Sequence, residues 1–179
     1  MLVVFGFALL VLAGAVVVLF AMLAELASRV PQPEPPWVQP LEEARLGHVP
    51  AAYPADLADD VSEERHVLLV LSTVCQSCQA IAVQLVEDHA DWADVALVIS
   101  TADRRNGEDF VARHKLGRFT YYIDEGGDWV SGEFGVQTSP TALVLRNGRL
   151  ASAYAFSDVA TLRSAVTEEG ERDKEKEAV

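Results

Sequence analysis

The sequence predicts an α/β fold, in which a mixed β-sheet is flanked by helices, with an N-terminal transmembrane helix. Three observations predict it. Short apolar runs that suit buried strands alternate with stretches of helical spacing, an Asn-Gly pair separates the last two runs, and an uncharged stretch of 23 residues opens the chain. An order of strand, helix, strand, helix that ends in a hairpin and a helix is typical of a mixed sheet.

The opening stretch, from Leu2 to Ala24, consists almost wholly of large apolar residues, alanine and glycine. At ~1.5 Å per residue, a helix of this length would cross a hydrocarbon core of about 30 Å. A cleaved signal peptide fits less well, because no Lys or Arg precedes the stretch, no A-x-A site follows it, and it exceeds the usual core of about 7–15 residues. We therefore expect residues 1–24 to be a retained transmembrane anchor.

The composition changes after the anchor and again near the C-terminus. Seven of the eight prolines lie between Pro31 and Pro54, in acidic surroundings, which predicts a Pro-rich acidic spacer over residues 25–46. Residues 168–179 are dense in charges of both signs, which is typical of a disordered tail. Residues 47–167 remain as a single globular domain.

The first half of this domain has two buried strands around a helix. The nearly all-apolar runs His66–Leu71 and Val95–Ile99 suit strands that are buried on both faces. Between them, Gln76–Glu87 has apolar residues at helical spacing and no Gly or Pro. A second helix is predicted over Asn106–Leu116, with a capping-box-like Asn-x-x-Asp start at Asn106 and a glycine just past its end.

The second half predicts three more strands and a helix. Phe119–Ile123 is rich in aromatic residues, and Thr141–Leu145 and Leu150–Phe156 flank the Asn-Gly pair, which is the strongest short hairpin signal. Ser157 and Asp158 offer N-caps for a last helix. Its apolar face is predicted to contain Val159, Leu162 and Val166.

The composition also excludes some partners. The 179 residues include 14 basic and 27 acidic side chains, for a net charge of −13, and the basic residues form no cluster. A protein that binds the phosphate backbone needs such a cluster, so we expect no nucleic-acid partner. With only two cysteines, the chain can form at most one intramolecular disulfide.

Both cysteines lie in Cys75-Gln76-Ser77-Cys78, where the first predicted strand ends and the first helix begins. A helix N-terminus presents unpaired N–H groups and the positive end of the helix dipole, which stabilise a thiolate. We therefore expect Cys75 to be the nucleophile and Cys78, one turn into the helix, to be the resolving thiol. Their spacing lets them form a disulfide with little backbone movement.

Three other functions of this motif fit less well. A haem-attachment site needs a histidine directly after the second cysteine, where the chain has Gln79. A structural zinc site needs four ligands, but the four histidines of the chain form no second paired motif that could complete one. They are His48, His66, His89 and His114. We therefore expect no metal and no cofactor. A purely structural disulfide would stabilise little, because its loop is short.

Pro140 is the only proline after Pro54, and it immediately precedes a predicted buried strand. A proline at the head of a central strand removes a hydrogen-bond donor, and a cis peptide bond is the usual reason for one there. We therefore expect a cis bond between Ser139 and Pro140. The alternative is an ordinary loop proline at the start of a strand.

Two segments resemble thioredoxin. Val67–Cys78 resembles its first half, and Gly135–Leu150 resembles its C-terminal half, with a cis-proline, a strand, an Asn-Gly hairpin and a returning strand. The resemblance covers about residues 60–167. The chain is longer than thioredoxin between the two motifs, and this extra material, around residues 106–134, is similar to the inserted segment of membrane-anchored proteins of the TlpA/ResA and MauD types.

The resemblance implies a thioredoxin-like fold and thiol–disulfide exchange through Cys75 and Cys78, with substrate bound at Ser139 and Pro140. It also implies protein clients with thiols or disulfides, a membrane redox partner, and a task such as cytochrome c maturation. The implied location is a bacterial cell membrane, crossed once, with the domain on the outer side.

Three features depart from the pattern of the family. Val74 replaces the tryptophan that is common before the first cysteine, and Leu69 replaces a buried acid that often assists the resolving cysteine. The dipeptide Gln76-Ser77 matches neither the reducing nor the strongly oxidising members, so it does not indicate whether clients are reduced or oxidised.

The charges around the hydrophobic stretch favour the opposite orientation. Only the α-amino group lies before the stretch, whereas Arg29 and Arg45 follow it, which by positive-inside counting favours a cytoplasmic domain. A tethered dithiol that exchanges disulfides fits an oxidising compartment instead. We follow this second argument, which agrees with the resemblance.

Two functions remain open. The first is a membrane-anchored thiol–disulfide oxidoreductase in which Cys75 attacks a client disulfide and Cys78 resolves the mixed disulfide. The alternative is a carrier of a soft metal such as Cu(I) that uses the same dithiol. Copper carriers of this fold have a wider cysteine spacing and a later histidine, and here no histidine follows His114. A peroxidase is disfavoured because Leu68 stands where its loop has proline.

Overall fold

The computed structural model describes residues 2–29, 35–58, 65–87 and 94–177. The chain divides into two compact units, Met1–Pro35 and Pro36–Val179. The first unit contains one helix, α1 (Leu2–Arg29), in which the described apolar side chains Phe5 and Phe20 are 72% and 68% exposed. Within the described part of the chain, no helix reaches the length and apolarity needed to cross a membrane, so the expected transmembrane anchor is not confirmed.

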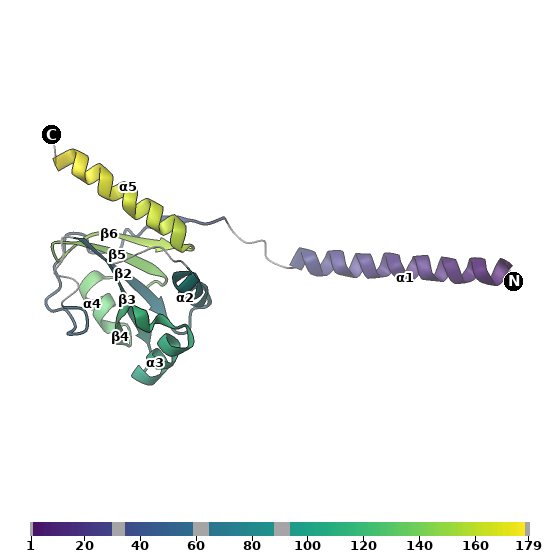
Figure 1. The fold of residues 1–179 in the computed structure, drawn as a ribbon, viewed down its shortest axis with the longest axis horizontal. Helices are drawn as coiled ribbons and strands as arrows, with labels where there is room; N and C mark the ends of the chain where they lie inside the picture. Colours follow the sequence, from purple (N-terminus) through teal and green to yellow (C-terminus); the bar gives the residue numbers. More distant parts are fainter. Residues whose placement is uncertain (1, 30–34, 59–64, 88–93, 178–179) are drawn as a thin grey trace. The chain divides into compact units, whose positions relative to one another are not determined.

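The second unit is built on a mixed sheet whose strand order is β1-β6-β5-β2-β3-β4 (Figure 1). The strands are β1 (Val38–Pro40), β2 (Arg65–Ser72), β3 (Val95–Thr101), β4 (Thr120–Glu125), β5 (Thr141–Arg146) and β6 (Arg149–Phe156). Strands β2, β3 and β4 are parallel, whereas β5, β6 and β1 join in antiparallel pairs. In register, Val67 of the central strand β2 lies opposite Val95 of β3 and Val144 of β5. The predicted mixed sheet is therefore confirmed.

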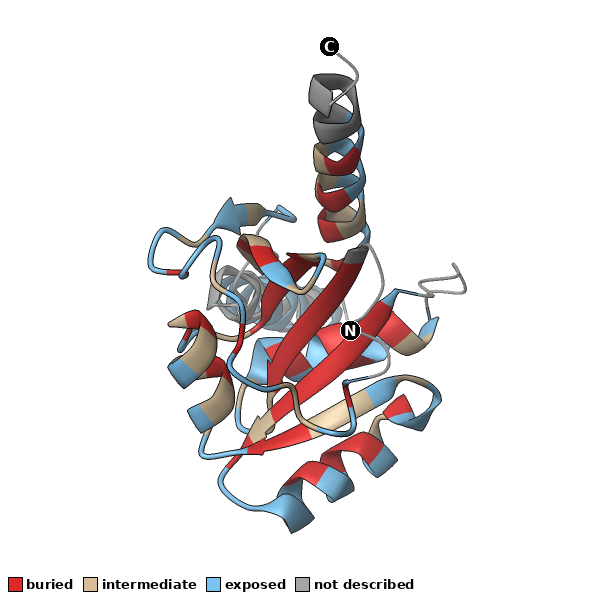
Figure 2. Ribbon diagram, turned by 90° about the vertical axis from the view of Figure 1, so that its left-hand side faces the viewer, coloured by how far each residue is buried: buried red, intermediate tan, exposed pale blue. Residues whose placement is uncertain are grey.

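Two apolar cores lie on opposite faces of the sheet. The first core is formed with three helices, α2 (Gln76–Glu87), α3 (Arg104–Arg113) and α5 (Val159–Glu177), and with the short 3₁₀ turn η1 (Leu116–Arg118). The second core is formed with α4 (Asp128–Phe134) and the segment between β1 and β2. Alternate residues of β2 point to the two cores, Leu69 to the first and Leu68 to the second. The buried strands run through the middle of the domain in Figure 2.

The predicted hairpin and the start of the last helix are confirmed. Asn147 and Gly148 have φ values of 51° and 72°, the positive values that a two-residue hairpin turn of type I′ requires. Asp158 Oδ1 accepts the N–H of Thr161 at 2.8 Å and so caps α5. The predicted face of α5 is buried: Val159, Leu162 and Val166.

The predicted boundaries of the second helix are wrong. Helix α3 begins at Arg104, because Asp103 is its N-cap and Asp103 Oδ1 accepts the N–H of Asn106 at 2.9 Å. The helix ends at Arg113. Lys115 then adopts a left-handed conformation with φ 55°, which separates α3 from the 3₁₀ turn that contains Leu116.

Two predicted domain boundaries also differ from the structure. The spacer predicted over residues 25–46 extends too far, because β1 pairs with β6 and Ala44 is buried in the second core. A proline fits there since Pro40 ends an edge strand. The predicted disordered tail is helical as far as Glu177, in a stretch rich in Glu and Lys, which favour helix. Residues 178 and 179 lie outside the described residues.

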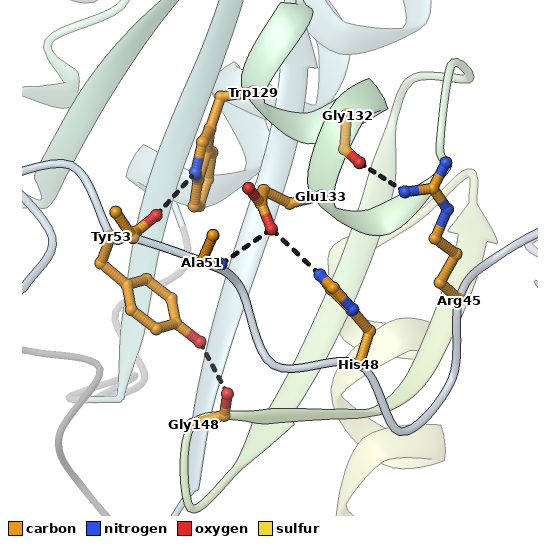
Figure 3. A network of polar contacts seen from close by, with 9 residues as sticks. Arg45, His48, Ala51, Tyr53, Trp129, Gly132, Glu133 and Gly148 are labelled. Carbon is orange, nitrogen blue, oxygen red and sulfur yellow. Dashed lines mark hydrogen bonds and ion pairs between the residues drawn. The ribbon is translucent and has the colours of Figure 1, made fainter.

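The segment from Arg45 to Tyr53 holds α4 against the domain (Figure 3). Glu133 Oε2 on α4 lies 3.0 Å from His48 Nε2 and accepts the N–H of Ala51 at 3.0 Å. The indole of Trp129 donates to the carbonyl of Ala52 at 3.1 Å. Because these contacts reach both ends of a helix of only seven residues, they fix its position beside the sheet.

Candidate active site

Cys75 immediately precedes α2 and acts as its N-cap. The N–H of Gln79 donates to the carbonyl of Cys75 at 3.2 Å, which closes the first helical turn. The N–H of Cys78 donates to Cys75 Sγ at 3.3 Å. At N-caps an oxygen of Ser, Thr, Asp or Asn normally accepts this bond. Here the acceptor is sulfur, so the backbone at the start of the helix favours the thiolate form of Cys75.

Polar neighbours add to this stabilisation. Cys75 Sγ lies 3.0 Å from the hydroxyl oxygen of Ser77 and 3.5 Å from the carbonyl oxygen of Ser139, to which the thiol can donate. Burial alone would raise the pKa of Cys75, but hydrogen bonds from Cys78 and Ser77 outweigh burial and lower the pKa below its usual value. The net effect is a thiol that ionises more readily than an ordinary one.

Cys78 has the opposite environment. Its side chain is fully buried in the first core, where Ile81 and Leu85 of the same helix are also buried. Burial, together with its hydrogen bond to Cys75, raises the pKa of Cys78 to about 12. One thiol is therefore partly exposed with a lowered pKa, and the other is buried with a raised pKa, a difference that the predicted roles of nucleophile and resolving thiol require.

The loop that contains the predicted substrate-binding residues lies against the dithiol. The Ser139–Pro140 peptide bond is cis, as predicted. Although 64 residues separate Ser139 from Cys75, the Ser139 carbonyl reaches the sulfur. Both cysteines are free thiols. The structure thus brings Cys75, Cys78, Ser139 and Pro140 together at the end of β2, whose last residue is followed by the turn that leads to Cys75.

The departures from the thioredoxin pattern are visible in the structure. Leu69 is completely buried beneath the site and carries no titratable group, while Val74 is 89% exposed beside the nucleophile.

In the part of the chain that the structure describes, no three His, Cys, Asp or Glu side chains gather where they could hold a metal ion.

Sequence reasoning missed the contribution of Ser77. The sequence shows a hydroxyl two residues after the nucleophile, but it does not show which way the side chain points. In the structure that hydroxyl approaches Cys75 Sγ at 3.0 Å. A small hydroxyl residue in the first turn of a helix, after a cysteine at the N-cap position, is the signal that could have identified it.

The difference between the two thiols predicts different reactivity with pH. Because the pKa of Cys75 is lowered, a larger share of this thiol is ionised at any given pH than of an ordinary thiol. Alkylation of the reduced protein with iodoacetamide, followed by peptide mass spectrometry, should therefore modify Cys75 first and Cys78 only under strongly alkaline conditions. Equal rates at the two cysteines would contradict the assignment of roles.

Comparison with known proteins supports the fold. No family model matches the chain, and no curated protein matches its sequence. Among solved structures, a putative thioredoxin from Neisseria meningitidis is 17% identical with a TM-score of 0.54, over 69% of this chain and 89% of that chain. A putative thiol:disulfide interchange protein DsbE from Chlorobium tepidum is 18% identical with a TM-score of 0.52, over 68% and 93%.

A third match is a putative protein disulfide isomerase from Bacteroides thetaiotaomicron, 15% identical with a TM-score of 0.50, over 71% of this chain and 89% of that chain. At such low identities these similarities concern the arrangement of the backbone. They agree with the mixed sheet and flanking helices described above. The chain has a mixed α/β, thioredoxin-like fold.

Proposed function

We propose that the protein is a thiol–disulfide oxidoreductase that exchanges disulfides with protein clients through Cys75 and Cys78. One observation carries the proposal. The sulfur of Cys75 accepts a backbone N–H at a helix start, lies against the carbonyl of Ser139, and stands one turn from a fully buried second thiol. This arrangement suits an attack by one cysteine followed by resolution by the other.

In the reducing direction, the Cys75 thiolate attacks one sulfur of a client disulfide. A bond forms between Cys75 and that sulfur, and the second client sulfur leaves as a thiolate that takes up a proton. Cys78 then loses its proton and attacks Cys75 Sγ. This step breaks the mixed disulfide, leaves a Cys75–Cys78 disulfide, and returns a client with two thiols, so two electrons pass to the client.

The same steps run backwards oxidise a client dithiol. Cys78 must lose its proton before it attacks, although its pKa is high. Once Cys75 is part of the mixed disulfide it carries no charge, which lowers the pKa of Cys78. The proximity of Cys78 to the attacked sulfur assists the attack. Turnover in either direction needs a second dithiol or disulfide protein, and a membrane redox partner fits this need.

The direct test is the reduction of insulin disulfides by dithiothreitol, measured as the precipitation of the insulin chain that is released. The full-length protein should accelerate the reaction, and Cys75→Ser should return it to the rate without protein. Stoichiometric Cu(I) binding at sub-micromolar free metal, without any acceleration, would favour the copper carrier instead.

We further propose that the protein is anchored in a bacterial cell membrane with the dithiol on the outer side. The uncharged stretch from Leu2 to Ala24 supports the anchor, and its length suits a single crossing. Disulfide exchange with clients fits an oxidising compartment, which supports the outward orientation.

This orientation predicts the labelling of the cysteines in intact cells. After mild reduction, a membrane-impermeant maleimide should label Cys75 before lysis, because the reagent reaches only the outer side of the membrane and Cys75 is the accessible thiol. A mass shift on a gel measures the labelling, and a cytoplasmic thiol protein in the same cells serves as the control. Labelling of Cys75 only after lysis would show that the domain faces the cytoplasm.

A further inference from the structure

A pocket of about 310 Å³ lies beside the candidate active site, on the second face of the sheet. It is bounded by the carboxyl ends of β2 and β3, by the start of α4, and by the loop that ends at Ser139. Ser139 thus belongs both to the pocket and to the surroundings of Cys75. The pocket therefore adjoins the proposed site of disulfide exchange.

The lining of the pocket is polar but uncharged. Five hydroxyl side chains line it: Ser72, Ser100, Ser131, Thr138 and Ser139. Three valines, Val70, Val130 and Val136, form its apolar floor and are buried. None of the described residues that line it is an Asp, Glu, Lys or Arg.

The segments that contain the dithiol and the proline loop are uncharged as well. The sequence has no Asp, Glu, Lys or Arg from Val67 to Val86 or from Gly135 to Leu145, although 23% of all residues are charged. Burial explains this within the strands, but not at exposed positions such as Val74, Gln76 and Gln137. A client that contacts these two segments therefore meets uncharged side chains, on a protein whose net charge is −13.

The faces of the sheet determine which client side chain would reach the pocket. Cys75 packs against the first core, whereas the valines of the pocket belong to the second core. In an extended strand, successive side chains point to opposite faces. When a client binds beside Ser139 as an extended strand with its cysteine pointing to Cys75, the next residue in its sequence points to the side of the sheet where the pocket opens.

We propose that this pocket is a specificity subsite for the residue adjacent to the reacting cysteine of the client, and that it selects an uncharged side chain such as threonine. The proposal rests on the proposed function and adds a substrate preference to it. Hydroxyl groups of the lining can exchange hydrogen bonds with a hydroxyl or amide of the client, and the valines can contact its methyl groups. A charged side chain would lose water without gaining a partner of opposite charge.

Peptide disulfides test the preference. The Cys78→Ser variant of the full chain, in detergent, is mixed with extended peptides whose single cysteine carries a thionitrobenzoate group. Four peptides are compared, in which both neighbours of the cysteine are Thr, Val, Lys or Glu, respectively. Release of the chromophore reports the attack of Cys75 on the peptide sulfur. The Thr and Val peptides should react roughly tenfold faster than the Lys and Glu peptides, with little change between low and high salt.

The possible results separate the subsite from the proposed function. If the net charge of the protein dominates, the Lys peptide will react fastest and lose its advantage in high salt, which would overturn the proposal. Equal rates for all peptides would overturn it too. The absence of reaction with every peptide would contradict Cys75 as the nucleophile, and so would count against the proposed function itself.

Substitutions at Ser131 of α4 connect the preference to the pocket. Ser131→Tyr should fill the pocket and bring the Thr-to-Lys rate ratio near one, whereas the same change at the exposed Ser164 of α5 should leave the ratio unchanged. Ser131→Lys provides a second readout, because a cation there should make the Glu peptide faster than the Lys peptide. Circular dichroism verifies that each variant folds. An unchanged ratio in both folded Ser131 variants would show that the pocket is not the subsite.

Discussion

Cys78→Ser should accumulate covalent complexes with client proteins, and Cys75→Ser should accumulate none. In the first variant, Cys75 keeps its hydrogen bond from the backbone N–H at position 78 and its contact with Ser77, so it still attacks. The thiol that would resolve the mixed disulfide is gone. In the second variant the remaining thiol is fully buried, and burial, the largest cause of the raised pKa of Cys78, is unchanged, so the thiol is neither exposed nor easily ionised.

The measurement is a non-reducing gel of cells that express each variant, compared with the same sample after reduction. Bands of high mass that disappear with reductant should be present for Cys78→Ser alone. Turnover in the insulin assay should fall roughly 10³-fold or more in both variants, the scale expected when a covalent nucleophile or its partner is removed. The double variant is the control. Equal trapping by the two single variants would contradict the division of roles.

Elements with a strong local pattern could be predicted from the sequence. The predicted helix Gln76–Glu87 agrees with α2 at both ends, and the strands β2, β3, β5 and β6 lie within two residues of their predicted limits. In each of these cases the apolar pattern and the turn residues indicate the same structure. The position of Cys75 at a helix start and the cis bond before Pro140 followed from the same local reasoning.

Elements that depend on distant contacts were missed. Strand β1 has three residues and ends in Pro40, so nothing local indicates a strand, and it forms because it pairs with β6 at the sheet edge. Helix α4 has seven residues with a glycine inside it and glycines at both caps. Its helical structure depends on a carboxylate from β4, on the segment from Arg45 to Tyr53, and on the burial of Val130 and Phe134.

The same reasons explain which parts of the candidate site the sequence indicated. The dithiol and the proline loop have motifs, and both were found. The pocket beside them is formed by the ends of two strands, a short helix and a loop, so its residues share no sequence pattern. Its neutral lining becomes apparent only when these segments are brought together.

Asp124→Ala should destabilise the domain by about 2–4 kcal/mol. Asp124 is buried, with 1% of its surface exposed, and it lies in β4 just before α4. Its two carboxylate oxygens accept the N–H groups of Trp129 and Val130 at 3.1 and 3.0 Å. The N-cap residue of α4 is Gly127, which has no side chain to offer, so Asp124 satisfies the helix start in its place. Its removal leaves one buried donor, at Val130, and one partly buried donor, at Trp129, without an acceptor. Each bond is worth about 1.5–3 kcal/mol when the acceptor is charged.

Urea unfolding, followed by circular dichroism and tryptophan fluorescence, measures this loss. Trp129 is a suitable reporter because its ring packs edge-on against Tyr122 and Phe134. Asp124→Asn should cost less, about 1–2 kcal/mol, since one acceptor oxygen remains. Asp128→Ala is the matched control: its carboxylate is exposed in the first turn of the same helix, so only the interaction with the helix dipole is lost, at most about 1 kcal/mol. A similar loss in both alanine variants would show that negative charge near the helix, rather than the two hydrogen bonds to Asp124, stabilises α4 and the pocket wall that it forms.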